Sequence, residues 1–181
     1  MFDINKDRVC IVVYGNLASG KSSFAKGLVK LLPGFKHVCM DQIRIDTYFQ
    51  DPSITSLELD RKCEKICNDT LLNTRLVIYE STGVSKFFKG IIPTIESKYK
   101  MFYIYLECPA EICIRRFADR KREGYFNIPP AFSDGTNINQ FINKVGSELR
   151  SVRKDLVLSS SKLSLEDECL ECLEYLKCLK L

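Results

Sequence analysis

The residues most able to do chemistry are the eight from Gly15 to Ser22, which match the pattern G-x-x-x-x-G-K-[ST] at every fixed position. Glycine at two points lets the backbone curl so that its N–H groups point toward a phosphate. Lys21 is expected to reach the β- and γ-phosphates of a nucleoside triphosphate, and the Ser22 hydroxyl to ligate Mg²⁺. The predicted phosphate-binding residues are Gly15, Asn16, Leu17, Ala18, Ser19, Gly20, Lys21, Ser22 and Ser23.

Two carboxylates each follow a short apolar run, as residues at the carboxyl end of a buried strand do. An unperturbed aspartate is ionised at neutral pH, so Asp41 can accept a proton from a substrate hydroxyl or hold that hydroxyl in line. Glu80 can hold Mg²⁺ through a water molecule or contact the substrate. Arg44 lies three residues beyond Asp41, and both face one cleft if this segment is helical. Together with Lys21, these residues predict phosphoryl transfer from a nucleoside triphosphate to a hydroxyl.

A basic run, residues 115–122, closes a segment with helical periodicity and opens into a polar stretch that contains glycine and proline. A charge run is most often a solvated helix face. Here the apolar residues lie opposite much of the basic face, which favours a lid over residues 120–140 that closes on the phosphates. Arg120 and Arg122 are the candidate catalytic arginines, and the sequence does not choose between them.

The elements that must position these residues alternate between strands and helices. The predicted strands are 9–14, 36–40, 75–79, 101–106 and 155–159, and the predicted helices are 22–32, 57–73 (with Ser56 as N-cap), 84–98 (broken or kinked at Pro93), 109–124, 141–153 and 165–179. Residues 125–139 are predicted to be a loop. Alternation of this kind predicts an α/β fold with a parallel sheet covered by helices on both faces. Ligands of such sheets bind at the carboxyl ends of the strands, where the loop after 9–14, Asp41 and Glu80 would meet.

The bulk composition limits the remaining possibilities. A chain of 181 residues with 45% hydrophobic and 28% charged residues fits a single domain spanning residues 1–181. No apolar stretch reaches the roughly 18 residues needed to cross a bilayer, so we expect no membrane partner and a cytoplasmic protein. The net charge of +4 suits an anionic substrate without indicating nucleic acid. The nine cysteines lack paired zinc-ligand spacing, so they and His37, the one histidine, are predicted to be structural.

These pieces, taken in order, resemble the polynucleotide-kinase-like and zeta-toxin-like P-loop kinases. The resemblance rests on Gly15 to Ser22, on Asp41-Gln42-Ile43-Arg44 as a D-x-x-R element, on Glu80-Ser81-Thr82 in place of D-x-T, on Cys108-Pro109 and the arginines after it, and on Ile128-Pro129. It implies the P-loop NTPase fold with sheet order 2-3-1-4-5, and ATP-dependent phosphorylation of a hydroxyl. It also implies Asp41 as general base, Arg44 on a substrate anion and a lid arginine at the transition state. Glu80 departs from the aspartate usual in that family.

The acceptor stays open at this stage. The D-x-x-R element favours an anionic acceptor, with a slight preference for a nucleotide or a polynucleotide 5′-hydroxyl, while the same skeleton serves kinases of small metabolites and antibiotics. A nucleotide switch is disfavoured because Asn143-Lys144 continues as Val145-Gly146 and gives no N-K-x-D motif. A non-kinase ATPase would need a larger companion domain.

Overall fold

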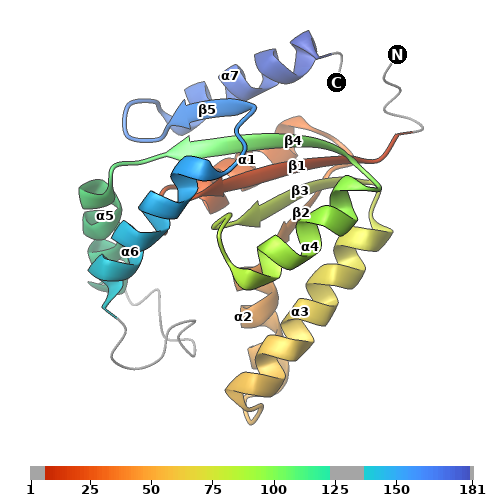
Figure 1. Cartoon of the computed structure of the whole chain (residues 1–181), viewed down its shortest axis with the longest axis vertical. Coiled ribbons are helices and arrows are strands. Elements are labelled where there is room, and N and C mark those ends of the chain that lie inside the picture. Colours follow the sequence, from red (N-terminus) through yellow and green to blue (C-terminus); the bar gives the residue numbers. More distant parts are fainter. Residues whose placement is uncertain (1–6, 123–136, 180–181) are drawn as a thin grey trace.

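The computed structural model describes residues 7–122 and 137–179, which form a five-stranded parallel sheet between two layers of helices (Figure 1). The strands are β1 (Val9–Gly15), β2 (Lys36–Cys39), β3 (Leu76–Ser81), β4 (Lys100–Glu107) and β5 (Leu156–Ser159). The helices are α1 (Lys21–Leu31), α2 (Met40–Gln50), α3 (Ser56–Asn73), α4 (Lys86–Glu96), α5 (Ala110–Arg122), α6 (Ile138–Glu148), the 3₁₀ turn η1 (Leu149–Ser151) and α7 (Leu165–Cys178).

The sheet order is β2-β3-β1-β4-β5, which confirms the predicted order and the predicted α/β class. β1 lies at the centre and pairs in parallel with β3 on one side and β4 on the other. All seven of its residues are buried, as a near-continuous apolar strand in a parallel sheet should be. Because all the pairings are parallel, the carboxyl ends of the strands share one edge.

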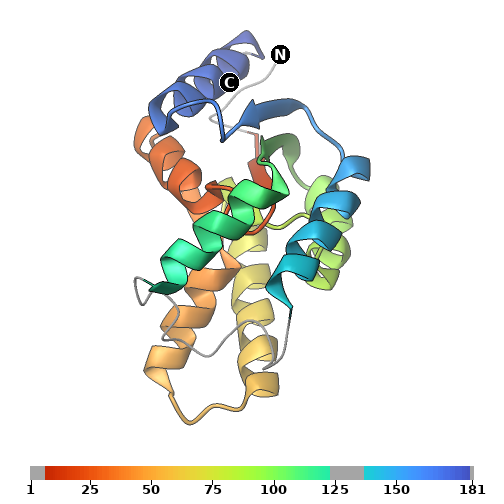
Figure 2. The ribbon, with the colours of Figure 1, turned by 90° about the vertical axis from the view of Figure 1, so that its left-hand side faces the viewer.

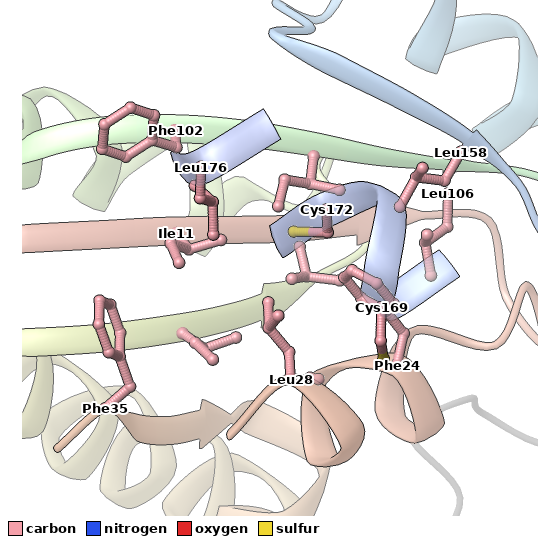
Figure 3. Packing of buried hydrophobic residues seen from close by; sticks show 14 of the residues in the cluster. Ile11, Phe24, Leu28, Phe35, Phe102, Leu106, Leu158, Cys169, Cys172 and Leu176 are labelled. Carbon is pink, nitrogen blue, oxygen red and sulfur yellow. The ribbon is translucent and has the colours of Figure 1, made fainter. Parts of the chain in front are cut away.

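One face of the sheet is covered by α1 and α7 (Figure 3). Side chains alternate along β1, so Val9, Ile11 and Val13 face this layer. They pack against Leu28 of α1 and Leu176 of α7. This packing fixes α1 beneath the sheet, directly after the loop that follows β1.

The opposite face is covered by α3, α4 and the segment from α6 to η1. Cys10, Val12 and Tyr14 of β1 point this way. Tyr14 stacks on Tyr105 of β4 with ring centroids 5.4 Å apart, and its hydroxyl donates to the carbonyl of Arg153. The two apolar layers therefore hold β1 from both sides.

The second strand is shorter than predicted, because β2 ends at Cys39 and α2 begins at Met40. Asp41 therefore lies in the first turn of a helix rather than at the end of a strand. The sequence conceals this helix because only Thr47 of α2 is buried, so no apolar stripe marks it. In both views α2 and α3 extend together away from the sheet (Figures 1 and 2).

Other element boundaries also differ from expectation. Thr55, not Ser56, caps α3, because its side chain accepts from the Glu58 N–H while Glu58 reaches back in a capping box. α4 continues through Pro93 without a break. α6 begins at Ile138, behind an Asn137 cap, so the last residues of the predicted loop are helical. Within the described residues, no helix is both long and apolar enough to cross a membrane.

Candidate functional site

The loop between β1 and α1 turns through two left-handed residues, Ala18 with φ 57° and Gly20 with φ 101°. The Ser19 N–H donates to the carbonyl of Asn16 at 3.2 Å and closes the turn. Gly20 is the N-cap of α1, and no side chain caps the helix there. The free N–H groups and the positive end of the helix dipole therefore face the hollow of the loop, which suits an anion.

Gly15 has a steric reason to be glycine. A Cβ at this position would lie 2.6 Å from the backbone oxygen of Leu106 and 2.8 Å from the hydroxyl of Ser19. The Ser19 hydroxyl is fully buried and has no hydrogen-bond partner among the described residues. A buried donor with nothing to bind is costly, and a phosphate oxygen in the loop would satisfy it.

Asn16 ties the loop to a distant helix. Its side-chain amide donates to the carbonyl of Ile142 in α6 at 2.9 Å, and its Oδ1 accepts from the N–H of Leu17 at 2.8 Å. Asn16 is buried, and Leu17 packs against the cluster formed by Cys108, Cys113 and Ile142. The loop conformation is thus braced by α5 and α6.

Lys21 is buried, and its Nζ donates to the carbonyl of Asn16 at 2.6 Å. Burial lowers the pKa of its ammonium, while the charges of Glu80 and Asp41 act in the opposite direction. The predicted phosphate-binding lysine therefore lies near two carboxylates at the carboxyl ends of the strands.

Glu80 lies one residue before the end of β3, and its two carboxylate oxygens have different partners. Oε1 accepts from the Ser22 hydroxyl at 2.6 Å, and Oε2 accepts from Nε2 of His37 at 2.9 Å. Burial acts to raise the pKa of Glu80, but the hydrogen bond from His37, the charge of Lys21 and the bond from Ser22 outweigh it and hold the pKa below its usual value. Glu80 is thus an ionised, fixed carboxylate.

Asp41 is exposed to solvent in the first turn of α2, yet its carboxylate is partly desolvated by the protein around it. This partial desolvation raises its pKa, and the charge of Glu80 adds to the effect, although Lys21 and Arg44 oppose it. A raised pKa makes the carboxylate a stronger base than a free aspartate. The structure therefore brings Asp41 together with Lys21, Ser22 and Glu80.

Arg44 lies on α2 close enough to Asp41 to lower its pKa. Its guanidinium pairs with Asp60 of α3, whose side chain is 55% exposed. The predicted anion-binding arginine is therefore held by an ion pair with α3, and its buried Nε has no partner among the described residues.

The basic run of α5 is divided by the structure. Arg120 is half-buried on α5, whereas the side chain of Arg122 and residues 123–136 of the predicted lid, including Ile128-Pro129, lie outside the described residues. Arg116 turns inward instead, and donates to the carbonyl of Ser160 at 2.8 Å and to the Cys108 sulfur at 3.6 Å.

Ser160 brings the segment after β5 to the phosphate loop, since a Cβ added at Gly20 would lie 4.0 Å from the Ser160 Cβ. Hydrogen bonding from Cys113 lowers the pKa of the Cys108 thiol, against the effect of burial and with help from Ser160 and Arg116. Cys108 and the arginines after it belong to the family resemblance, but their contact with Ser160 was not predicted, because it joins residues 44 positions apart in the sequence.

The residues present fit a Mg²⁺ ion. The cation prefers oxygen ligands and often binds proteins through one or two carboxylates and retained waters. The Ser22 hydroxyl and the ionised Glu80 carboxylate meet beside the phosphate loop, and each offers an oxygen ligand to the ion.

Solved kinases share the fold of this chain. A shikimate kinase from Acinetobacter baumannii, solved with shikimate, superimposes with a TM-score of 0.65 over 97% of this chain and 96% of its own, at 17% identity. The chain has the fold of the P-loop kinases. The adenylyl-sulfate (APS) kinase CysC of Mycobacterium tuberculosis, solved with AMPPNP and APS, matches with a TM-score of 0.57, 16% identity, and coverage of 94% of this chain and 99% of that one.

A chain of the Pnkp1/Rnl/Hen1 RNA repair complex shares the same P-loop kinase fold, with a TM-score of 0.61 and 17% identity over 80% of this chain and 45% of that chain. No family profile matches the sequence, and no curated protein shows significant similarity to it. The neighbours thus span small-molecule kinases and an RNA repair assembly, so they support the P-loop kinase fold and not the polynucleotide-kinase-like or zeta-toxin-like subtype.

Proposed function

We propose that this protein is an ATP-dependent kinase that transfers the γ-phosphate of ATP to a hydroxyl. The observation that carries the proposal is the convergence of Lys21, Ser22, Glu80 and Asp41 at one end of the sheet. Phosphoryl transfer needs charge neutralisation, in-line positioning and a group that orients the attacking hydroxyl. Each of these needs has a residue in this group.

In this proposal the loop amides and Lys21 hold the phosphates. ATP binding exchanges the bond from Lys21 to the Asn16 carbonyl for bonds to phosphate oxygens. Ser22 and Glu80 would hold Mg²⁺, which supplies charge neutralisation to the β- and γ-phosphates when bound. Asp41, which is exposed to solvent, would orient the acceptor hydroxyl and take up the proton that this hydroxyl loses.

The acceptor is proposed to be anionic, because Arg44 lies beside Asp41 and keeps a donor without a partner among the described residues. A nucleotide or polynucleotide 5′-hydroxyl is the first candidate, in line with the D-x-x-R resemblance and with the RNA repair neighbour. A small anionic metabolite is the second, supported by shikimate and APS in the other neighbours. We also propose that the chain acts as one domain in which Arg120 or Arg122 and a lid over residues 120–140 stabilise the transition state.

The test is transfer from γ-labelled ATP to a panel of acceptors: nucleosides, oligonucleotides with a 5′-hydroxyl, sugars, shikimate-like acids and hydroxylated antibiotics. Lys21→Ala should abolish ATP binding and transfer. Asp41→Asn should leave ATP binding intact and lower kcat by about 100-fold or more, the range for a lost general base. Transfer at the parental rate by Asp41→Asn would remove Asp41 from the mechanism.

A further inference from the structure

The one histidine of the chain lies beside a cysteine and a carboxylate. His37 Nε2, the Cys39 sulfur and a Glu80 carboxylate oxygen all lie within 4.8 Å of one another, and they are the only such group of three or more metal-ligating side chains in residues 7–122 and 137–179. His37 and Cys39 are neighbours in the sequence, but Glu80 lies 43 residues after His37. The cluster is therefore a product of the fold.

The strand register explains why the three side chains meet. β2 and β3 pair in parallel with Cys39 opposite Glu80, so these two side chains leave the sheet on the same face. His37 precedes Cys39 by two residues and points to that face as well. α1 covers this face and brings Ser22 to the other oxygen of Glu80.

We propose that His37, Cys39 and Glu80 form a three-ligand site for a thiophilic divalent cation, with Zn²⁺ as the representative ion. A thiolate, an imidazole nitrogen and a carboxylate oxygen are ligands that Zn²⁺ accepts, whereas Mg²⁺ avoids sulfur. Three protein ligands leave a fourth tetrahedral position open to water. The thiolate and the carboxylate together balance the charge of the ion.

The three ligand atoms need to move only a short distance to bind one tetrahedral ion. Ligands about 2.1 Å from a tetrahedral ion lie roughly 3.4 Å apart. The His37–Glu80 pair, at 2.9 Å, would open by about half an ångström, and the other separations, within 4.8 Å, would close by at most about 1.4 Å. Binding releases the Cys39 proton to solvent. The proton that His37 Nε2 shares with Glu80 is replaced, by exchange through solvent, by one on Nδ1, so that Nε2 can bind the ion.

Because Glu80 takes part in both sites, the cation would also act on the proposed kinase chemistry. Its Oε2 would bind the thiophilic ion, while Oε1 faces Ser22. An occupied site draws negative charge away from the Mg²⁺ position. Inhibition of transfer is thus a consequence that rests on the proposed function, whereas binding itself does not.

The experiment measures binding without nucleotide. The full chain is titrated with Co²⁺ and, separately, with Zn²⁺ against a chromophoric chelator. We expect one equivalent of Co²⁺ to give a thiolate-to-cobalt charge-transfer band in the near ultraviolet and the intense visible bands of tetrahedral cobalt. Cys39→Ser and His37→Gln should lower the Zn²⁺ affinity by about tenfold or more, and Cys39→Ser should remove the charge-transfer band.

Matched controls come from the other cysteines. Cys178→Ser alters the exposed thiol and Cys63→Ser a buried thiol of α3, and both should keep the band and the affinity. A charge-transfer band that survives Cys39→Ser, or that disappears in Cys178→Ser, would overturn the proposal. So would the absence of Zn²⁺ binding at micromolar concentration by a chain whose thermal unfolding is normal. Failure of the kinase assay leaves these readouts unaffected, so the two proposals are tested separately.

Discussion

The most informative perturbation is Asn16→Ala, which disconnects the phosphate loop from α6. The substitution removes two hydrogen bonds, one to the Ile142 carbonyl at 2.9 Å and one from the Leu17 N–H at 2.8 Å. The Ile142 carbonyl keeps its place in the helix ladder, whereas the Leu17 N–H loses the acceptor that Asn16 provides. At about 1 kcal/mol for each bond, the free energy of unfolding should fall by about 2 kcal/mol.

For a chain of this length, that loss corresponds to a decrease in Tm of about 4 to 8 °C. Urea denaturation followed by circular dichroism measures the free energy, and equilibrium titration measures ATP affinity, which should fall because the loop loses its brace. Asn143→Ala is the matched control, since this asparagine is exposed on α6 next to Ile142 and should change stability by less than about 0.5 kcal/mol.

Asn16→Asp separates the two bonds. The aspartate still accepts from the Leu17 N–H but turns an oxygen toward the Ile142 carbonyl, so at neutral pH it should be at least as destabilising as alanine. The reasoning would be refuted if Asn16→Ala unfolded within about 0.5 kcal/mol of the parent chain and bound ATP equally well.

The other predictions concern three charged residues, Arg44, Glu168 and Glu80. Arg44→Ala should raise the KM for the acceptor and leave kcat little changed, which steady-state kinetics measures. It should change the free energy of unfolding, measured by urea denaturation, by no more than about 1 kcal/mol, because its partner Asp60 is half exposed. A lower kcat at constant KM would instead show that Arg44 acts in catalysis. Burial raises the pKa of Glu168 on α7 from 4.5 to about 7 although Arg116 opposes it, so the folded state holds this proton more tightly than the unfolded state. The stability of the parent chain relative to Glu168→Gln should therefore fall as the pH rises from about 4.5 to 7 and stay constant above, which Tm measurements across that range test. The pKa of Glu80 is lowered from 4.5, so its ionised form stabilises the fold above that pH; the stability of the parent chain relative to Glu80→Gln should decline as the pH falls below about 4.5, and parallel acid-unfolding curves would contradict this.

Much of the fold could be predicted because its signals are local. The apolar runs, the glycine loop and the alternation of elements predict the sheet and its helices, and the P-loop resemblance supplies the strand order. α2 could not be predicted from periodicity, since Thr47 is its one buried residue. The predicted N-cap of α3, Ser56, was wrong by one residue, although Thr55 and Glu58 have the S/T-x-x-E spacing of a capping box.

The residues of the candidate site that belong to a motif could be predicted from the sequence. Contacts between segments far apart in the sequence could not. Lys21, Ser22, Asp41 and Glu80 come together at the sheet edge as the rule for parallel sheets predicts. The partner of Asn16 lies 126 residues away, and His37 meets Glu80 across 43 residues, so no local pattern reports either contact. His37 was predicted to be structural, and the structure adds that its Nε2 bonds the Glu80 carboxylate of the candidate site.

The central position of β1 has a consequence for the free energy of nucleotide binding. Its seven residues are all buried and are paired on both sides, so its amide hydrogens exchange with solvent only when the whole sheet unfolds. The phosphate loop is attached to this strand at one end and to the packed helix α1 at the other. The conformational entropy of the loop is therefore lost during folding rather than during binding, so the nucleotide of the proposed reaction would meet a loop that is already in shape.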